Sequence, residues 1–235
     1  MENGTLITTK NLVKQFPVGG GKFTALNGIN LSIETGEFCG LVGPSGSGKT
    51  TLLNIIGVLD NPTGGTSHVM GQNTGELSHK EAAKLRKEHL GFIFQTYNLL
   101  PVYTVYENVE FPLLLLRMDD SARKDAVTQA LEWVGLTDKA KSRPSQLSGG
   151  ESQRVAVARA MVKKPKIVIA DEPTANLDAA NSYNILEMMV KLNDELKTTF
   201  LFATHDEKVI NFLRRKITLS DGKVIGDIEQ TPHTN

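Results

Sequence analysis

The sequence predicts an α/β fold with a mostly parallel sheet, and three observations support this prediction. In the first and last thirds of the 235-residue chain, short apolar segments typical of strands alternate with helical segments. The middle, from about Thr104 to Lys163, is helical in character throughout. An apolar segment, Phe38 to Val42, leads into a glycine-rich stretch that opens a helix. We therefore expect a core of strands and helices that a helical insert interrupts.

The first third predicts strands separated by glycine-rich turns. Two of the strands flank the turn at residues 19–21, and a third is apolar enough to be buried. A charged helix and a further strand follow. In chain order we expect strands at Leu6 to Phe16, Phe23 to Ile33 and Phe38 to Val42, a helix at Ser78 to Glu88, and a strand at Gly91 to Gln95.

The helical insert and the last third are read in the same way. From Ser121 to Val134, apolar residues recur at the spacing of a helix that buries one face. Pro112 predicts a kink and Pro144 a loop. In the last third we expect a buried strand at Lys166 to Ala170, a helix at Asn181 to Leu196, a strand at Thr199 to Ala203, and a hairpin of Arg215 to Ser220 with Lys223 to Ile228 around Asp221-Gly222.

The composition limits the possible partners. Lys and Arg number 26, and so do Asp and Glu, so the formal net charge is zero. This balance argues against a nucleic acid or an anionic lipid surface held by bulk charge. The single cysteine, Cys39, lies in an apolar strand and fits a reducing cytoplasm. No apolar run approaches the length of a membrane helix, so a separate chain must supply the spans if this protein serves a membrane.

The most informative motif is a phosphate-cradling loop between the third strand and a helix. It has the pattern G-x-x-x-x-G-K-[ST], in which glycines allow several backbone N–H groups to point at one phosphate. The lysine supplies a charge to the outer phosphates, and the last hydroxyl can ligate Mg²⁺. The loop consists of Gly43, Pro44, Ser45, Gly46, Ser47, Gly48, Lys49 and Thr50. An ordinary turn is the alternative, and the flanking strand and helix disfavour it.

An acidic pair ends a second predicted strand. Asp171 and Glu172 follow the apolar run from Lys166 to Ala170, at the sheet edge where ligands of open α/β sheets lie. Asp171 is placed to hold Mg²⁺ together with Thr50, and Glu172 to polarise an attacking water. A pair of carboxylates facing solvent is the alternative. The presence of a phosphate loop favours the metal interpretation.

A second helix start could bind an anion. Ser148 is a good N-cap, and Gly149 and Gly150 expose unhindered N–H groups before Glu151. On physical grounds alone, a well-capped helix with no ligand is the favoured interpretation. A second cradle in a protein with one phosphate loop suggests that two surfaces clamp the same phosphate chain.

Taken together, these motifs resemble the nucleotide-binding subunit of an ATP-binding-cassette (ABC) transporter over nearly the whole chain. The resemblance rests on the phosphate loop, Gln95, Leu147–Glu151, Ile167–Glu172, Leu177-Asp178 and His205, in the order and spacing of that family. It implies the ABC ATPase fold as a single domain, 1–235. Residues 1–95 and 164–229 would form a RecA-like core with an antiparallel β subdomain, and residues 96–163 a helical subdomain.

The resemblance also implies roles for individual residues. Lys49 and the backbone of Gly46 to Thr51 would bind the β- and γ-phosphates of ATP. Thr50, Gln95 and Asp171 would surround Mg²⁺, with Glu172 as the catalytic carboxylate and His205 on the γ-phosphate. Phe16 would stack on adenine, although the family often has Tyr there and Phe16 could equally belong to the core. Ser148, Gly149, Gly150 and Asp178 would face the second site of a homodimer that encloses ATP. Glu151 replaces the usual glutamine.

The partners implied are integral membrane permease subunits on a separate chain, and no nucleic acid. The chain would lie at the cytoplasmic face of the inner membrane, with a groove around Gln95 to Pro101, near Tyr103 and Tyr106, for a short helix of the permease. The segments Asn54–Asp60, Phe94–Pro101 and Glu107–Leu113 are similar to the lipoprotein-release and macrolide-export group. The cargo is not encoded in this sequence.

Three alternatives remain at this point. The first is a mechanotransmitting ATPase of the cell-division type, which transports nothing. The second is an ABC ATPase acting on DNA or ribosomes, although the sequence lacks the long coiled-coil insertion or second cassette of such proteins. The third is a nucleotide sensor that does not hydrolyse ATP. Co-purification with a permease, salt-dependent nucleic-acid binding and steady phosphate release would distinguish them.

Overall fold

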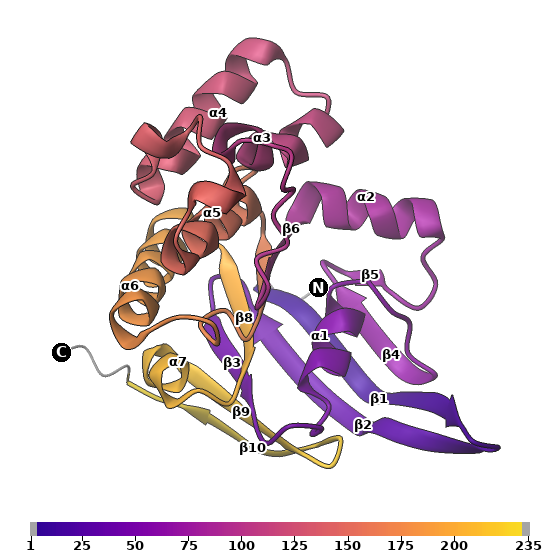
Figure 1. The fold of residues 1–235 in the computed structure, drawn as a ribbon. Helices are drawn as coiled ribbons and strands as arrows, with labels where there is room; N and C mark the ends of the chain where they lie inside the picture. Colours follow the sequence, from indigo (N-terminus) through magenta and orange to yellow (C-terminus); the bar gives the residue numbers. More distant parts are fainter. Residues whose placement is uncertain (1–3, 232–235) are drawn as a thin grey trace.

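The computed structural model describes residues 4–231, which form two sheets and a layer of helices (Figure 1). The larger sheet has the strand order β10-β9-β3-β8-β7-β6, and all its neighbouring strands run parallel except the β9–β10 pair. Its strands are β3 (Phe38–Val42), β6 (Leu90–Phe94), β7 (Ile167–Asp171), β8 (Thr199–Thr204), β9 (Arg215–Ser220) and β10 (Lys223–Glu229). The predicted α/β fold with a mostly parallel sheet is confirmed.

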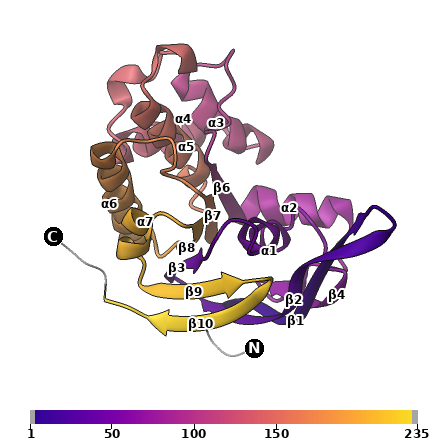
Figure 2. The same cartoon turned by 60° about the horizontal axis from the view of Figure 1, so that its bottom comes forward.

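The smaller sheet is antiparallel, as the family resemblance implies. Its strand order is β2-β1-β4-β5, with β1 (Thr5–Val18), β2 (Gly21–Glu34), β4 (Gly64–Val69) and β5 (Gln72–Asn73). The sequence analysis located β1 and β2 but not β4 or β5. Figure 2 shows that this sheet and the β9–β10 hairpin lie beneath α1. The hairpin turn is at Asp221-Gly222, where both residues have positive φ, as the sequence predicts.

The helices cover the larger sheet on both faces (Figure 1). α1 lies between the two sheets, and α3, α4 and α5 form the layer at the top of the view. Their bounds are α1 (Lys49–Ile56), α2 (His79–His89), α3 (Val105–Leu115), α4 (Asp120–Trp133), α5 (Gly149–Met161), α6 (Ala179–Leu196) and α7 (Glu207–Phe212). Pro112 lies in the last turn of α3, and Pro144 opens a short 3₁₀ turn. α7 was not predicted, and the division at residues 96 and 163 stays a prediction.

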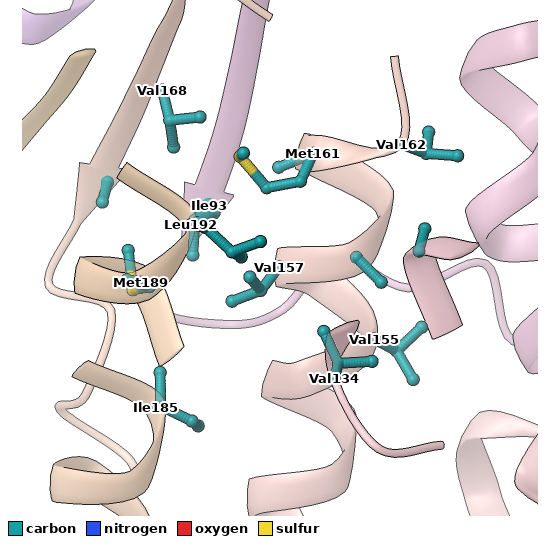
Figure 3. Packing of buried hydrophobic residues seen from close by; sticks show 14 of the residues in the cluster. Ile93, Val134, Val155, Val157, Met161, Val162, Val168, Ile185, Met189 and Leu192 are labelled. Atoms are coloured by element: carbon teal, nitrogen blue, oxygen red, sulfur yellow. The ribbon is translucent and has the colours of Figure 1, made fainter. Parts of the chain in front are cut away.

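Two apolar clusters hold the layers together because side chains alternate across each strand. Phe38, Phe200 and Phe202 pack on one face of the larger sheet, with ring centroids of Phe38 and Phe202 4.8 Å apart. On this face α5 and α6 bury Val157, Met161 and Met189 against the strands (Figure 3). The opposite face carries Cys39 and Leu41 and packs against α1 and the antiparallel sheet. The strand β3, which leads into the phosphate loop, is therefore packed on both faces.

Strand register brings four chain segments to one edge of the sheet. Val42 of β3 lies opposite Thr204, Asp171 of β7 lies opposite Ala203, and Phe94 of β6 lies opposite Asp171. The residues that follow these strand ends therefore leave the sheet together. This carboxyl edge is the general position of ligand sites in open α/β sheets.

Candidate functional site

The phosphate loop forms a left-handed turn that ends in the start of α1. Gly46 and Gly48 have φ of 80° and 103°, a region that L side chains rarely adopt. Gly48 is the N-cap of α1, and no side chain accepts a hydrogen bond from the first turn. The first N–H groups of α1 are therefore left for a ligand, at the positive end of the helix dipole. The buried hydroxyl of Ser47 also has no hydrogen-bond partner within the described residues.

The two left-handed glycines differ in the space around them, and this gives a first prediction. A Cβ at Gly48 would lie 2.7 Å from the Ala25 carbonyl oxygen, whereas a Cβ at Gly46 would meet no atom within 4 Å. We expect Gly46→Ala to lower the free energy of unfolding by about 1 kcal/mol, through backbone strain alone. Gly48→Ala should cost about 2 kcal/mol more because the backbone must also shift. Urea denaturation of both variants measures the difference. Equal losses of unfolding free energy would contradict the expected clash of a Cβ at residue 48 with the Ala25 carbonyl oxygen.

Lys49 is buried inside the loop. Its ammonium group donates hydrogen bonds of 2.7 Å to the carbonyl oxygen of Gly43 and 2.9 Å to that of Pro44. These bonds keep the charge within the phosphate cradle and close the loop around it. An ammonium group has three donors, so one remains for a phosphate that enters the loop.

Thr50 and Asp171 meet across the gap between α1 and β7. The Thr50 hydroxyl donates to Asp171, with Oγ1 3.2 Å from Oδ2. Burial raises the pKa of the Asp171 carboxyl, and the hydrogen bond from Thr50 partly opposes this rise. A hydroxyl and a carboxylate beside a phosphate site are the oxygen donors that Mg²⁺ uses with substrate phosphates. No cluster of three or more His, Cys, Asp or Glu suitable for a metal occurs within residues 4–231, and a phosphate-bound Mg²⁺ does not require one.

Glu172 is held by the end of the neighbouring strand β8. Its Oε2 accepts a hydrogen bond of 3.1 Å from the Thr204 hydroxyl, and its Oε1 lies 2.6 Å from Nδ1 of His205. With Glu172 ionised, its carboxylate only accepts, so this contact assigns a proton to Nδ1 of His205. Glu172 has φ of 45°, an uncommon conformation for a residue with a side chain. Such backbone strain concentrates at functional sites.

These segments enclose one cavity of about 440 Å³ at the carboxyl edge of the sheet. The structure brings most of the predicted site residues to it, and adds two that the sequence analysis missed. The predicted residues are Ser45, Gly46, Gly48, Lys49, Thr50, Thr51, Gln95, Asp171, Glu172 and His205, and the additional ones are Phe23 and Ala25 of β2. The only sequence signal for the latter pair is that both lie in the strand predicted from Phe23 to Ile33.

Phe16 does not line this cavity, whereas Phe23 does. The two rings lie on adjacent strands, since Phe16 pairs directly with Phe23 in the β1–β2 ladder, and directly paired residues share a face of the sheet. Phe16 is partly exposed and lies under the ammonium group of Lys14, 5.1 Å from its ring centroid. The adenine-stacking role of Phe16 stays a prediction, and Phe23 becomes a second candidate for it.

The predicted second anion site is a capped helix start, and it lies outside the cavity. Ser148 is the N-cap of α5, and its hydroxyl accepts from the N–H of Glu151 at 3.2 Å. The Glu151 carboxylate in turn accepts from the N–H of Ser148 at 2.8 Å. Gly149 is exposed, and Gly150 is buried against Asn181, where a Cβ would lie 2.5 Å from its Oδ1.

Glu151 has a structural role in this capping box. The backbone N–H and then the hydroxyl of Ser148 lower the pKa of the Glu151 carboxyl, and Lys139, 3.5 Å away, adds to the effect. The negative charge of Glu151 is thus paired with the N–H of Ser148 and the ammonium group of Lys139. Because the pKa is lowered, the ionised Glu151 stabilises the folded state at pH values above its ordinary pKa. This contribution disappears as the pH falls through the lower pKa of the folded state.

We therefore expect Glu151→Gln to lower the free energy of unfolding by only a few tenths of a kcal/mol at pH 7, since the amide oxygen can still accept from Ser148. Glu151→Ala should cost about 1 kcal/mol because it removes half of the capping box. Urea denaturation at pH 7 and at decreasing pH measures both. The difference in free energy of unfolding between wild type and Glu151→Gln should shrink as the pH falls. A difference that grows would contradict the stabilising role of the ionised Glu151.

Asp178 begins α6 and also lies away from the cavity. Its side chain accepts hydrogen bonds from the backbone N–H of Asn181 at 2.8 Å and from the Asn181 amide at 2.6 Å. These bonds lower the pKa of Asp178. Since Asn181 also contacts Gly150, the starts of α5 and α6 lie side by side. One chain thus presents a phosphate cavity and, separately, a surface formed by two helix starts.

A phosphate loop, an Asp-Glu pair at the end of β7 and a His at the end of the neighbouring strand β8 define a nucleoside-triphosphate hydrolase on an α/β scaffold. Comparison with known proteins agrees: residues 26–175 match the family model described as ABC transporter. The chain belongs to the ABC transporter family and is an ATP-binding ATPase domain of it.

Several relatives resemble the chain over its full length. It is 42% identical to the lipoprotein-releasing system ATP-binding protein LolD of Pseudoalteromonas translucida, covering 98% of this chain and 99% of that protein. It is also 42% identical to the macrolide export ATP-binding/permease protein MacB of Burkholderia pseudomallei, but spans only 35% of that longer protein. Among solved structures, the ATP-binding cassette MJ0796, in a dimeric post-hydrolysis state bound to ADP and phosphate, matches with a TM-score of 0.88 at 40% identity, covering 95% of this chain and 98% of that one.

Proposed function

We propose that the chain hydrolyses ATP in a homodimer that encloses two nucleotides, and that this powers membrane subunits on a separate chain. The observation that carries the proposal is the separation of the two anion-binding surfaces. The phosphate loop, Asp171, Glu172 and His205 share one cavity, whereas Ser148 and Gly149 are exposed on another part of the chain. A second copy placed head to tail would bring its Ser148 turn over this cavity.

The residues of the cavity have complementary roles in this proposal. Lys49 and the free N–H groups of α1 bind the outer phosphates of ATP. Thr50, Asp171 and Gln95 hold Mg²⁺, which neutralises phosphate charge when bound. Glu172 accepts a hydrogen bond from the attacking water and polarises it, since its Oε2 and Oε1 are already oriented by Thr204 and His205.

The dimer gives hydrolysis its mechanical effect. ATP bound in one cavity would accept hydrogen bonds from the partner's helix start, so nucleotide binding favours the closed pair and phosphate loss favours separation. Asp178 lies beside that helix start, because Asn181 contacts both Asp178 and Gly150. It is therefore placed to relate the state of one site to the other. The solved relative MJ0796 is described as dimeric with ADP and phosphate bound.

A second cavity, of about 510 Å³, supports docking of a membrane subunit. It lies between α2, α3, α5 and β6 and includes Asn98 and Leu100 of the predicted groove. Tyr103 and Tyr106 do not line it: Tyr106 packs against the helical core, and Tyr103 lies against Phe111. The lining is apolar with a basic contribution from Arg86, Lys87, Arg159 and Lys163, and it includes no acidic residue. It therefore fits an amphipathic helix that carries a carboxylate.

No helix among residues 4–231 is long and apolar enough to cross a membrane. We infer that the chain binds at the cytoplasmic face of the inner membrane through permease subunits. Two relatives are named for lipoprotein release and macrolide export, which makes envelope cargo of this kind the proposed substrate class for the whole complex.

Phosphate release from ATP by the purified chain tests the proposal. We expect steady release with Mg²⁺, none with EDTA, and a specific activity that rises with protein concentration as dimers form. Co-expression with a candidate permease subunit should yield a complex, and Leu115→Asp in the second cavity should disrupt it without changing basal hydrolysis. Phosphate release at background, or an activity independent of protein concentration, would contradict the shared site.

A further inference from the structure

Arg159 connects α5 to the loop that carries Gln95. Its guanidinium group donates from Nη1 to the carbonyl oxygen of Asn98 and from Nη2 to that of Tyr97, both at 2.6 Å. These are charge-assisted hydrogen bonds of short length, made by a fork of two donors to two successive peptide groups. No sequence motif marks this contact, because Arg159 lies far along the chain from the loop.

The loop that Arg159 holds has a strained backbone. Tyr97 and Asn98 have φ of 58° and 48°, so two successive residues with side chains occupy the left-handed region. Such conformations cost free energy and persist only where the surroundings fix them. Both residues present the carbonyl groups that Arg159 binds. The contact is therefore well placed to maintain this conformation.

The same loop contacts the other parts of the site. The Asn176 amide donates to the carbonyl oxygen of Gln95 at 2.9 Å. The Tyr97 hydroxyl lies against Gly149, 3.2 Å from where a Cβ would be. Asn98 and Arg159 line the second cavity, whereas Gln95 lines the phosphate cavity. A short segment thus spans the distance between the two cavities and touches the helix start at Ser148.

The burial of Arg159 argues for a specific role. Most of its side chain is removed from water, and this burial lowers the pKa of its guanidinium. Taking a guanidinium out of water is unfavourable unless its donors are satisfied, and no acidic partner of Arg159 occurs among the described residues. The two loop carbonyls compensate for that cost. A merely apolar contact at this position would not need a charged residue.

We propose that Arg159 is a positioning residue for ATP hydrolysis, which holds the 95–98 segment so that the Gln95 side chain reaches the phosphate cavity. The inference rests on the proposed role of Gln95 at Mg²⁺. It links α5, whose first turn would face the partner's nucleotide, to the chain's own site. It also places Arg159 where an occupant of the second cavity can act on Gln95.

The test compares Arg159→Met, Arg159→Lys and Gln95→Ala in the full chain, with Lys124→Met as a control that removes an exposed cation from α4. We expect Arg159→Met to lower kcat by roughly 10- to 100-fold, as a small displacement of a reacting group does. The affinity for nucleotide in EDTA should stay unchanged, since the phosphate loop is untouched. The Mg²⁺ concentration for half-maximal activity should rise in Arg159→Met and Gln95→Ala alike. Arg159→Lys should be intermediate.

Two further measurements separate this inference from its premise. The double variant with Gln95→Ala should be no slower than Gln95→Ala alone, because Arg159 acts through Gln95. Amide hydrogen exchange at residues 95–98 should be faster in Arg159→Met. If Gln95→Ala keeps wild-type kcat and Mg²⁺ dependence, the role of Gln95 fails. Two outcomes overturn the role of Arg159 while Gln95→Ala is impaired. One is that a folded Arg159→Met or Arg159→Lys protein matches Lys124→Met in kcat, Mg²⁺ dependence and exchange. The other is that the losses of kcat from Arg159→Met and Gln95→Ala multiply in the double variant.

Discussion

Glu172→Gln is expected to slow ATP hydrolysis by about a thousandfold, within the range for loss of a general base, while ATP binding survives. Glutamine retains the size of Glu172 and an oxygen that can accept from Thr204, so the strand ends should stay in place. It lacks the negative charge that polarises water. ATP then persists between the subunits, and we expect a dimer in ATP and Mg²⁺.

Phosphate release and size-exclusion chromatography measure the two effects. Glu207→Gln is the matched control, because Glu207 is an exposed carboxylate on the nearby helix α7 that does not line the cavity. It should behave as wild type in both measurements. Normal turnover by Glu172→Gln, or only monomer in ATP and Mg²⁺, would contradict the role assigned to this residue.

Lys49→Ala is expected to weaken ATP binding by about a hundredfold, the scale of losing one or two hydrogen bonds from a charged group. The Lys49 ammonium lies inside the loop on the Gly43 and Pro44 carbonyl groups. The substitution removes the phosphate's cation and also two contacts that close the loop. Titration with a fluorescent nucleotide measures the dissociation constant, with Lys84→Ala on α2 as a surface control. Unchanged affinity in a folded Lys49→Ala protein would contradict the cradle.

Much of the site follows from local sequence, for a physical reason. The phosphate loop, Asp171-Glu172 and His205 each follow an apolar strand, and parallel strands present their carboxyl ends at one edge. Recognising the strands therefore suffices to bring these residues together. The boundaries differ by a residue or two, as at Gln95, which lies just beyond β6 rather than at its end.

The features that could not be predicted from the sequence depend on contacts between segments that are distant along the chain. β4 is a short strand with two glycines, and its place beside β1 is decided by the antiparallel sheet rather than by its own pattern. Phe23 lines the cavity, and the register of the β1–β2 ladder decides on which face of the sheet its side chain lies. The left-handed Tyr97 and Asn98 have no glycine to mark them, and Arg159, which holds them, reads as one more residue of an amphipathic helix.

The central claim is that two copies of the chain share each site, and a mixture of two defective variants tests it most directly. Ser148→Arg blocks the outward-facing helix start, and Lys49→Ala weakens the protein's own phosphate cavity. Each variant alone should hydrolyse ATP at background. In an equal mixture, a mixed dimer has one site with an intact cavity and an intact partner helix start, so activity should recover to about a quarter of wild type per chain. A mixture no more active than the sum of its folded components would contradict the shared site.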